Sequence, residues 1–244
     1  MYINEYTILG MLSKNYTCDT DNMLIYKKKD KSKVISFDAN YHDSTLSEIN
    51  YAYITNKPKN IKGVYTSNEV VSCFPNTYFS DLKLYSKEIY ETRNKWNKKI
   101  VVKKTLDNIQ DVLDMLDRWV QLSGKKYRFT RHDGYDRNFF INYYEKHKDT
   151  FDCNFFYLDN KLVGYSVMSP KIKDTYYYVI RKVDISAGRN ICEYVDYKTF
   201  ENLNDSGFYV NWGASSGGVL KYKTTKFPLY SQETRYFWKV KNEI

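Results

Sequence analysis

The segment Asp184–Asn190 joins a β-branched run to a stretch with helical periodicity, and it contains a glycine and an arginine. Free backbone N–H groups at a helix N-terminus attract phosphate, and Arg189 adds a positive charge beside them. The alternative is an ordinary turn in which a side chain of the segment caps the helix. We expect four residues to contact the phosphates of a donor molecule: Ser186, Gly188, Arg189 and Asn190.

Asp184 itself stands at the exit of the expected strand. A buried carboxylate there would suit proton removal from an acceptor amine or hydroxyl. The alternative is a structural ion pair with Arg181 or Arg189.

A second loop, Gly213–Gly218, follows an expected strand at 208–212 and consists of glycine, serine and alanine. Glycines let backbone N–H groups approach a carbonyl oxygen or a phosphate closely, as the oxyanion of an acyl-transfer reaction requires. We expect Gly213 and Ser215 to contact the donor, with Asn211 at the reacting group. The alternative is a tight turn.

Basic residues alternate with aromatic residues in two places, a pattern that suits a nucleic-acid backbone. Four of the eight arginines fall within residues 118–137, and arginine suits bidentate phosphate contacts. The alternative is a set of solvated loops in a chain rich in lysine. The expected nucleic-acid contacts are Arg128, Arg131, Lys221, Lys223 and Lys226.

The chain of 244 residues carries a formal net charge of +9. Residues 1–82 contain nine basic and nine acidic residues, so residues 83–244 carry the whole excess. A basic half indicates an anionic partner, either a nucleic acid or a phosphate-bearing molecule.

Composition excludes several classes of protein. With 42% hydrophobic and 27% charged residues, the chain is not disordered throughout. No apolar run approaches the ~18 residues of a membrane span, and the N-terminus lacks the pattern of a signal peptide. The four cysteines form no CxxC pair and no His/Cys spacing suggests a metal site, so we expect a cytoplasmic protein without a metal.

Hydrophobic periodicity predicts an α+β chain. The expected helices lie at 44–54, 81–96, 106–122 with Thr105 as N-cap, 136–146, 191–203 and 219–224. The expected strands lie at 23–27, 33–37, 98–104, 151–158, 162–168, 175–183, 208–212 and 234–240.

From residue 98 the order β α α β β β α β α β resembles the GNAT acyltransferase fold, in which a mixed sheet splits between its fourth and fifth strands. The segment Val210–Phe227 (VNWGASSGGVLKYKTTKF) resembles the segment small-Gly-x-Ser … Phe-Lys-x-Lys-Phe of the tandem-GNAT aminoacyltransferases. That group includes the Fem-type peptidoglycan enzymes and the phosphatidylglycerol lysyltransferases. Arg93-Asn-Lys in the helix before the strand at 98–104, and Trp119 near the end of the next helix, also resemble residues of that group. The phage Mom-type DNA-modifying proteins resemble the chain in size and charge.

The resemblance implies a GNAT-like, mostly antiparallel twisted sheet flanked by helices at 83–244. A smaller α+β unit at 1–82 would stand where the group carries a degenerate first GNAT half. It implies transfer of an acyl or aminoacyl group, from acyl-CoA or aminoacyl-tRNA, to an amine or hydroxyl. DNA or tRNA would be the anionic partner.

The same resemblance places the reaction in a cleft between the strands at 175–183 and 208–212. There Asp184 or a water would act as the base, and Tyr222 as the acid that protonates the leaving group. The CoA signature Gln/Arg-x-x-Gly-x-Gly/Ala is absent. The alternative is therefore a catalytically inactive GNAT fold that binds nucleic acid.

Overall fold

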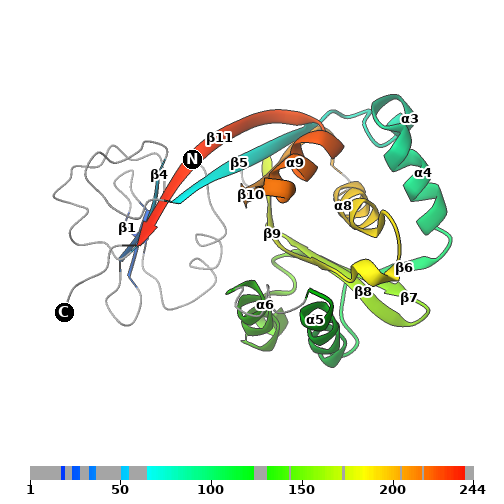
Figure 1. Ribbon diagram of the computed structural model, residues 1–244, viewed down its shortest axis with the longest axis horizontal. Helices are drawn as coiled ribbons and strands as arrows, with labels where there is room; N and C mark the ends of the chain where they lie inside the picture. The colour runs from blue at the N-terminus through cyan, green and yellow to red at the C-terminus, as the bar shows by residue number, and fades with distance from the viewer. Residues whose placement is uncertain are drawn as a thin grey trace. The chain divides into compact units, whose positions relative to one another are not determined.

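The computed structural model describes residues 18–19, 24–27, 33–36, 51–54, 65–123, 131–142, 144–171, 174–203, 205–215 and 217–239 (Figure 1). By compactness the chain divides into two units. One comprises residues 74–209, and the other comprises residues 1–73 together with 210–244. The boundary expected at residue 82 stays a prediction.

The unit at 74–209 is built on an antiparallel meander. Its strands follow the order β6 (Ile100–Lys103), β7 (Asp152–Leu158), β8 (Lys161–Met168) and β9 (Thr175–Val183). Asp159 and Asn160 join β7 to β8 with φ of 50° and 61°, the left-handed conformation of a two-residue hairpin turn. The meander expected from the sequence is confirmed.

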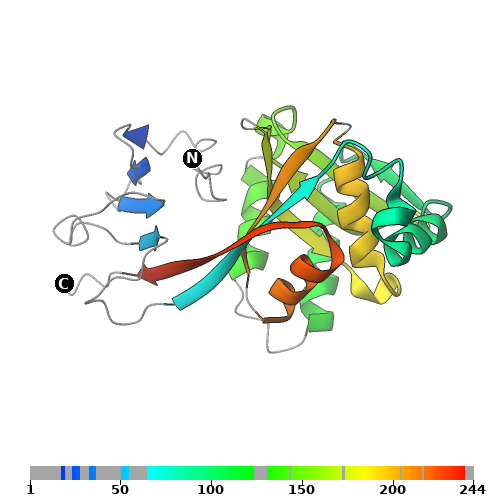
Figure 2. The same ribbon diagram turned by 90° about the horizontal axis from the view of Figure 1, so that it is seen from above.

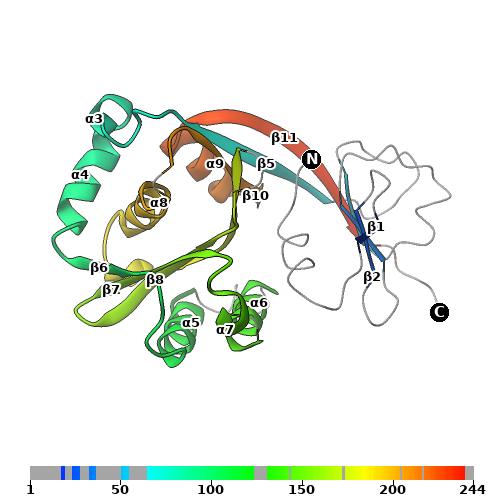
Figure 3. The ribbon, with the colours of Figure 1, turned by 180° about the vertical axis from the view of Figure 1, so that it is seen from behind.

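Helices cover both faces of this sheet (Figures 1 and 3). One face carries α4 (Lys87–Trp96) and α8 (Ile191–Glu201), which pack against each other. The other face carries α5 (Gln110–Ser123), α6 (Arg131–Asn142) and α7 (Tyr144–His147). A short helix, α3 (Leu82–Tyr85), precedes α4, and a 3-10 turn, η2 (Ile185–Ala187), precedes α8.

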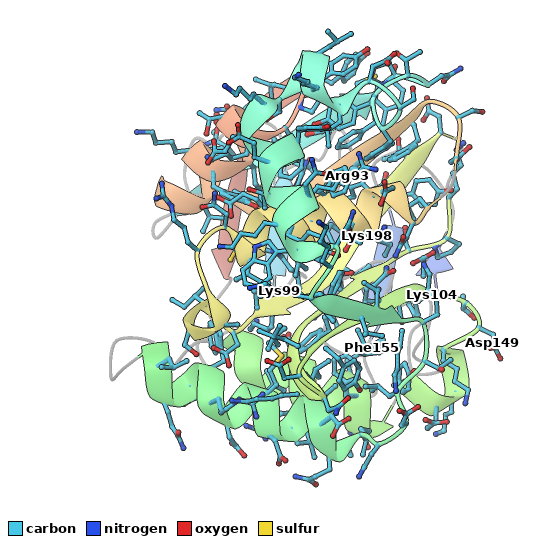
Figure 4. The ribbon with its side chains drawn as sticks, turned by 90° about the vertical axis from the view of Figure 1, so that its right-hand side faces the viewer. Arg93, Lys99, Lys104, Asp149, Phe155 and Lys198 are labelled. Carbon is cyan, nitrogen blue, oxygen red and sulfur yellow. The ribbon has the colours of Figure 1, made fainter. Side chains whose placement is uncertain are left out.

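Alternating side chains of the strands fill two separate cores. On one face Phe156 packs with Trp96, Tyr194 and neighbouring aliphatic residues. On the other face Phe155 contacts the rings of Phe140 and Tyr144, and Figure 4 shows it below the sheet, toward the second helical layer. Because successive strand residues point to opposite faces, two adjacent phenylalanines serve both cores.

The second unit contains a mixed sheet, in which β3 and β4 pair in parallel. Its strands follow the order β1 (Cys18–Asp19), β2 (Leu24–Lys27), β3 (Lys33–Ser36), β4 (Tyr51–Ile54), β11 (Leu229–Lys239), β5 (Tyr65–Phe74) and β10 (Phe208–Ser215). The long strands β5 and β11 run antiparallel side by side, and α9 (Gly217–Lys226) packs against β11 (Figure 2). β10 begins in the first unit and continues in the second.

One expected element is wrong over the residues that the structure describes. Residues 51–54 of the helix expected at 44–54 form β4, which pairs parallel with β3 and antiparallel with β11. Its residues, Tyr-Ala-Tyr-Ile, serve a strand as well as a helix, so cross-strand pairing decides. Residues 44–50 lie outside the described residues.

Several other boundaries shift. The helix expected at 136–146 begins at Arg131 and is divided into α6 and α7, and β11 begins at Leu229 and not at 234. Three further shifts have local reasons. The helix expected at 81–96 breaks at Ser86, whose hydroxyl caps α4 by accepting from the Ile89 N–H at 3.3 Å. The helix expected from 106 begins at Gln110, and Asn108 rather than Thr105 accepts a hydrogen bond from its first N–H, at 2.9 Å. β10 continues to Ser215, so residues 213–215 are strand and not loop.

None of the helices within the described residues is long and apolar enough to cross a membrane.

Candidate functional site

Strand β9 leads into Asp184, a buried carboxylate with only 1% of its surface exposed. Its Oδ1 accepts hydrogen bonds from the backbone N–H of Ser186 at 3.0 Å and from the Ser186 hydroxyl at 2.5 Å. Its Oδ2 lies 3.4 Å from Nε of Arg118 on α5. Asp184 therefore makes a structural ion pair with Arg118, not with either of the two arginines expected from the sequence.

The loop after Asp184 is held against α4. Gly188 has a φ of 149°, and a Cβ at this position would lie 2.9 Å from Cη2 of Trp96, so only glycine fits. Asn190 adopts a left-handed φ of 62°, and its Nδ2 lies 3.4 Å from Oγ1 of Thr92. These contacts fix the course of the backbone, whereas Arg189 between them is exposed.

No side chain of this loop caps α8. Asn190 occupies the N-cap position without a side-chain hydrogen bond to the helix, and Ser186 donates to Asp184 instead. The first N–H groups of α8 are therefore not satisfied by the side chain of Ser186 or of Asn190. Glu193 in the first turn adds a negative charge. A phosphate at this position would depend on backbone N–H groups and on Arg189.

Arg181 and Lys182, at the end of β9, point to opposite faces of the sheet and form separate ion pairs. Nε of Arg181 lies 2.7 Å from Oδ1 of Asp196 on α8, and the Tyr178 hydroxyl donates to the same oxygen at 2.7 Å. Nζ of Lys182 lies 3.0 Å from Oδ2 of Asp136 on α6. Burial, with the negative charge of Asp196, raises the pKa of Tyr178 well above its usual value. Both cations thus hold helices onto the sheet.

In the second unit, Asn211 on β10 is buried and bridges two strands. Its Nδ2 donates to Oε1 of Glu69 on β5 at 3.0 Å, and its Oδ1 accepts from the Gly213 N–H at 2.8 Å. Gly213 has a φ of 68°, and nothing lies within 4 Å of a Cβ placed there. The backbone conformation, not crowding, therefore requires glycine, and its N–H is already engaged inside the strand.

Lys223 on α9 is tied to the end of β10. Its ammonium donates to the carbonyl oxygen of Trp212 at 2.7 Å and to Oγ of Ser215 at 2.6 Å, and it lies 5.8 Å from the centre of the Trp212 ring. Lys221 on the same helix is exposed. The Tyr222 ring lies edge-on to Phe227, with centroids 6.3 Å apart. Of the three lysines expected to contact nucleic acid here, Lys223 thus has an internal partner.

The remaining site residues stay predictions. Arg128 lies outside the described residues, and Arg131 begins α6 with its side chain outside them. The Tyr209 N–H donates to the carbonyl oxygen of Asp174 at 2.9 Å, so β9 and β10 are neighbours where they begin. Whether their far ends line one cleft is a relation between the two units, and it too stays a prediction.

Two residues that hold these side chains were missed by the sequence reasoning: Arg118, partly buried on α5, and Glu69, buried within β5. Arg118 was assigned only to a basic cluster, and Glu69 falls in a stretch with no assigned element. Both find partners far along the chain, Asp184 and Asn211, and nothing in the local sequence marks such pairs.

The similarity of this chain to known proteins lies in its fold. No protein-family model matches the chain, and no curated protein matches it. A Bacteroides thetaiotaomicron protein of unknown function aligns with 14% identity and a TM-score of 0.64, covering 98% of this chain and 90% of its own. A GCN5-related N-acetyltransferase-like protein from Streptococcus suis aligns with 14% identity and a TM-score of 0.54, covering 96% and 93%. The C-terminal domain of a proposed lysylphosphatidylglycerol synthetase from Agrobacterium fabrum aligns with 11% identity and a TM-score of 0.53, covering 96% and 86%.

These likenesses extend over nearly the whole chain at low identity, so they show the fold and not the activity. The α+β class and the GNAT resemblance inferred from the sequence are both confirmed at that level. The protein has a GNAT-like fold of the kind found in acyltransferases and in a lysylphosphatidylglycerol synthetase domain.

Proposed function

We propose that the protein is a GNAT-like transferase that moves an acyl or aminoacyl group to an amine or hydroxyl. The fold supports the reaction class. The observation that carries the proposal is the turn from β9 into α8, where the Asn190 side chain does not cap the helix and Arg189 is exposed. Such a turn suits the phosphates of an activated donor, either acyl-CoA or aminoacyl-tRNA.

The proposed chemistry is direct transfer. The acceptor attacks the carbonyl carbon of the donor ester or thioester, and Tyr222 returns a proton to the leaving oxygen or sulfur. Asn211 contributes to the polar surroundings of the carbonyl. Because both oxygens of Asp184 are occupied, a water is the better base. Asp184 instead keeps in place residues 184–190, which we call the donor loop.

The proposed partner is a nucleic acid, as donor (tRNA) or as acceptor (DNA). The +9 charge supports this choice. Two arginines of the 118–137 cluster contribute less than the sequence suggests, because Arg118 pairs with Asp184 and Arg137 pairs with Asp117 at 2.6 Å. A cytoplasmic location stays a prediction from the cysteine pattern.

The direct test is a thermal-shift screen of the full chain against acetyl-CoA, longer acyl-CoAs, aminoacyl-tRNA and duplex DNA. We expect one activated donor to raise the melting temperature of the protein. Substitution of the exposed Arg189 by glutamine (Arg189→Gln) should abolish that increase. Lys146→Gln, an exposed charge on the opposite helical layer, is the matched control. A donor that stabilises Arg189→Gln as much as the wild type would contradict the assignment of residues 184–190 as the phosphate-binding loop.

A second candidate function is a catalytically inactive GNAT fold that binds nucleic acid, favoured by the missing CoA signature. Mass spectrometry of nucleosides and aminoacyl products from cells expressing the protein separates the two. New acylated or aminoacylated products support the transferase. Nucleic-acid binding without any donor shift or product supports the inactive module.

A further inference from the structure

Cations of the unit at 74–209 fall into two groups. Many are paired with acids, including the three arginines Arg118, Arg137 and Arg181. Among the described residues of this unit, eight cations form no ion pair. Lys83 lies in α3 and Lys146 in α7, and the Arg93 guanidinium lies 6.0 Å from the centre of the Tyr197 ring on α8. The other five define what we call the basic end surface: Lys95, Lys98, Lys99, Lys161 and Arg189.

Strand register brings these residues to one end of the sheet. Ile100, the first residue of β6, pairs with Leu158, the last residue of β7, and Leu158 pairs in turn with Lys161. The backbone N–H of Asp184 donates to Val163 in the same hairpin at 2.8 Å. The start of β6, the β7–β8 turn and the donor loop after β9 therefore share an end.

Trp96 joins the remaining cations to the donor loop. The Lys95 ammonium lies 4.7 Å from the centre of the Trp96 ring, and the Lys99 N–H donates to the Trp96 carbonyl at 2.9 Å. The same indole lies against Gly188, the neighbour of Arg189. Figure 4 faces this region and shows Lys99 where α4 passes into β6, with Lys104 at the far end of that strand.

Few acids oppose this charge. Asp159 in the β7–β8 turn and Glu193 on α8 lie at the same end, and Asp184 is neutralised by Arg118. Favourable placement at a helix C-terminus accounts for Lys95, which sits in the last turn of α4. It does not account for Lys161 and Arg189, which come from two other loops.

The apolar side chains around this end argue against a membrane as the partner. Few large apolar residues among those that the structure describes are exposed near this end: Ile185 in η2 at 66%, and Leu122 at 52%, one turn beyond Arg118 on α5. Val101 is exposed too, but it follows the inward-facing Ile100 and so points to the other face of the sheet. A lipid surface is usually held by several inserted apolar groups beside its basic ones.

We propose that the basic end surface binds the phosphate backbone of the nucleic-acid partner, next to the donor loop. The inference rests on the proposed function for its purpose and names the surface that this partner uses. It differs from the surface expected from the sequence. There the Lys223 ammonium donates to Trp212 and Ser215 instead. Arg128 and the side chain of Arg131 lie outside the described residues.

The test compares two triple variants of the full chain that lose the same charge. Lys98→Gln/Lys99→Gln/Lys161→Gln removes three cations of the basic end surface, and Lys83→Gln/Lys87→Gln/Lys146→Gln removes three exposed lysines elsewhere on the unit. Binding of fluorescein-labelled tRNA and of a 20-base-pair DNA duplex is measured by anisotropy at 50, 100 and 200 mM KCl. Phosphatidylglycerol vesicles serve as the third probe, followed by flotation.

We expect the first variant to weaken binding of one nucleic acid at least tenfold at 100 mM KCl. The slope of log K against log salt should flatten by about 2–3, since each phosphate contact contributes roughly 0.9 on duplex DNA. The control variant should change affinity less than twofold, and both should melt like the wild type. Equal losses in both variants would show a mere net-charge effect and overturn the proposal. Vesicle binding without nucleic-acid binding would overturn it in favour of a membrane.

The outcome is independent of turnover. Loss of binding in the first variant supports the surface even when no acyl transfer is found. A protein that transfers an acyl group yet binds neither nucleic acid keeps its proposed reaction class and loses this surface.

Discussion

The guanidinium of Arg118 ties α5 to two strands at once. Its Nε lies 3.4 Å from Oδ2 of Asp184 beyond β9, and its Nη2 donates to the carbonyl oxygen of Leu162 on β8 at 2.7 Å. The acid that looks most like a catalytic base in the sequence is thus also the anchor of the donor loop.

We therefore expect Asp184→Asn to lower the free energy of unfolding by about 1–3 kcal/mol, the usual cost of weakening a charged hydrogen bond in a buried site. The matched control is Asp117→Asn, whose ion pair with Arg137 is largely exposed and should be worth no more than about 1 kcal/mol. Urea unfolding measures both. Unchanged stability in Asp184→Asn, together with a loss of turnover, would restore Asp184 as the base.

Gly188 should be intolerant of any side chain. Its φ of 149° and the 2.9 Å approach of Trp96 predict that Gly188→Ala lowers the melting temperature, with a cost of about 1–3 kcal/mol. Gly218→Ala is the control, because a Cβ there meets nothing within 4 Å and alanine favours the helix α9. Equal melting temperatures for the two variants would mean that the loop moves away from Trp96 freely.

High pH should unfold the protein through its buried tyrosines. Burial raises the pKa of Tyr176 and of Tyr194 to about 12, and that of Tyr178 further still. A hydroxyl whose pKa is higher in the folded state stabilises that state fully below pH about 10. This contribution is lost as the pH rises from about 10 to about 12.

Absorbance of phenolate at 295 nm and circular dichroism should therefore change together in that interval. Complete phenolate formation in a protein that keeps its circular dichroism would contradict the burial of these side chains.

Most of the first unit follows from local sequence signals. The strands at 151–158, 162–168 and 175–183 alternate as a two-faced sheet requires, and Asp159-Asn160 is a natural hairpin turn. The helix expected at 191–203 begins at Ile191, as predicted. These elements need no information from distant residues, so the sequence predicts them within one or two positions.

The candidate site was less predictable because its residues are paired over long sequence distances. Glu69 meets Asn211 142 residues later, and Arg118 meets Asp184 66 residues later. A sequence marks Asp184 as an acid at a strand end, but it does not say which cation the fold brings beside it. The helix predicted over residues 51–54 was wrong for the same reason, because pairing with the distant strands β3 and β11 makes this segment a strand.

Tyr222→Phe tests the proposed acid. Removing one general acid typically lowers turnover by ~10²–10⁴, and phenylalanine preserves the ring packing against Phe227. We expect a loss of that size, with donor affinity unchanged, once the donor is identified by the thermal-shift screen. Tyr230→Phe is the control, an exposed tyrosine on β11. Full turnover in Tyr222→Phe would reject the role.

Lys221 and Lys223 separate a binding role from a structural one on the same helix. The Lys223 ammonium donates to a β10 carbonyl and to Ser215, whereas Lys221 is exposed. Lys223→Met keeps the length of the side chain but leaves the Trp212 carbonyl without this donor, so we expect a loss of about 1–3 kcal/mol in unfolding free energy.

Lys221→Met should leave the stability of the protein unchanged. It should lower nucleic-acid affinity if α9 contacts the phosphate backbone of the nucleic acid. Thermal melting and anisotropy with labelled tRNA distinguish the two effects. A Lys223→Met variant that melts normally and binds more weakly would show that the ammonium serves the ligand and not the strand.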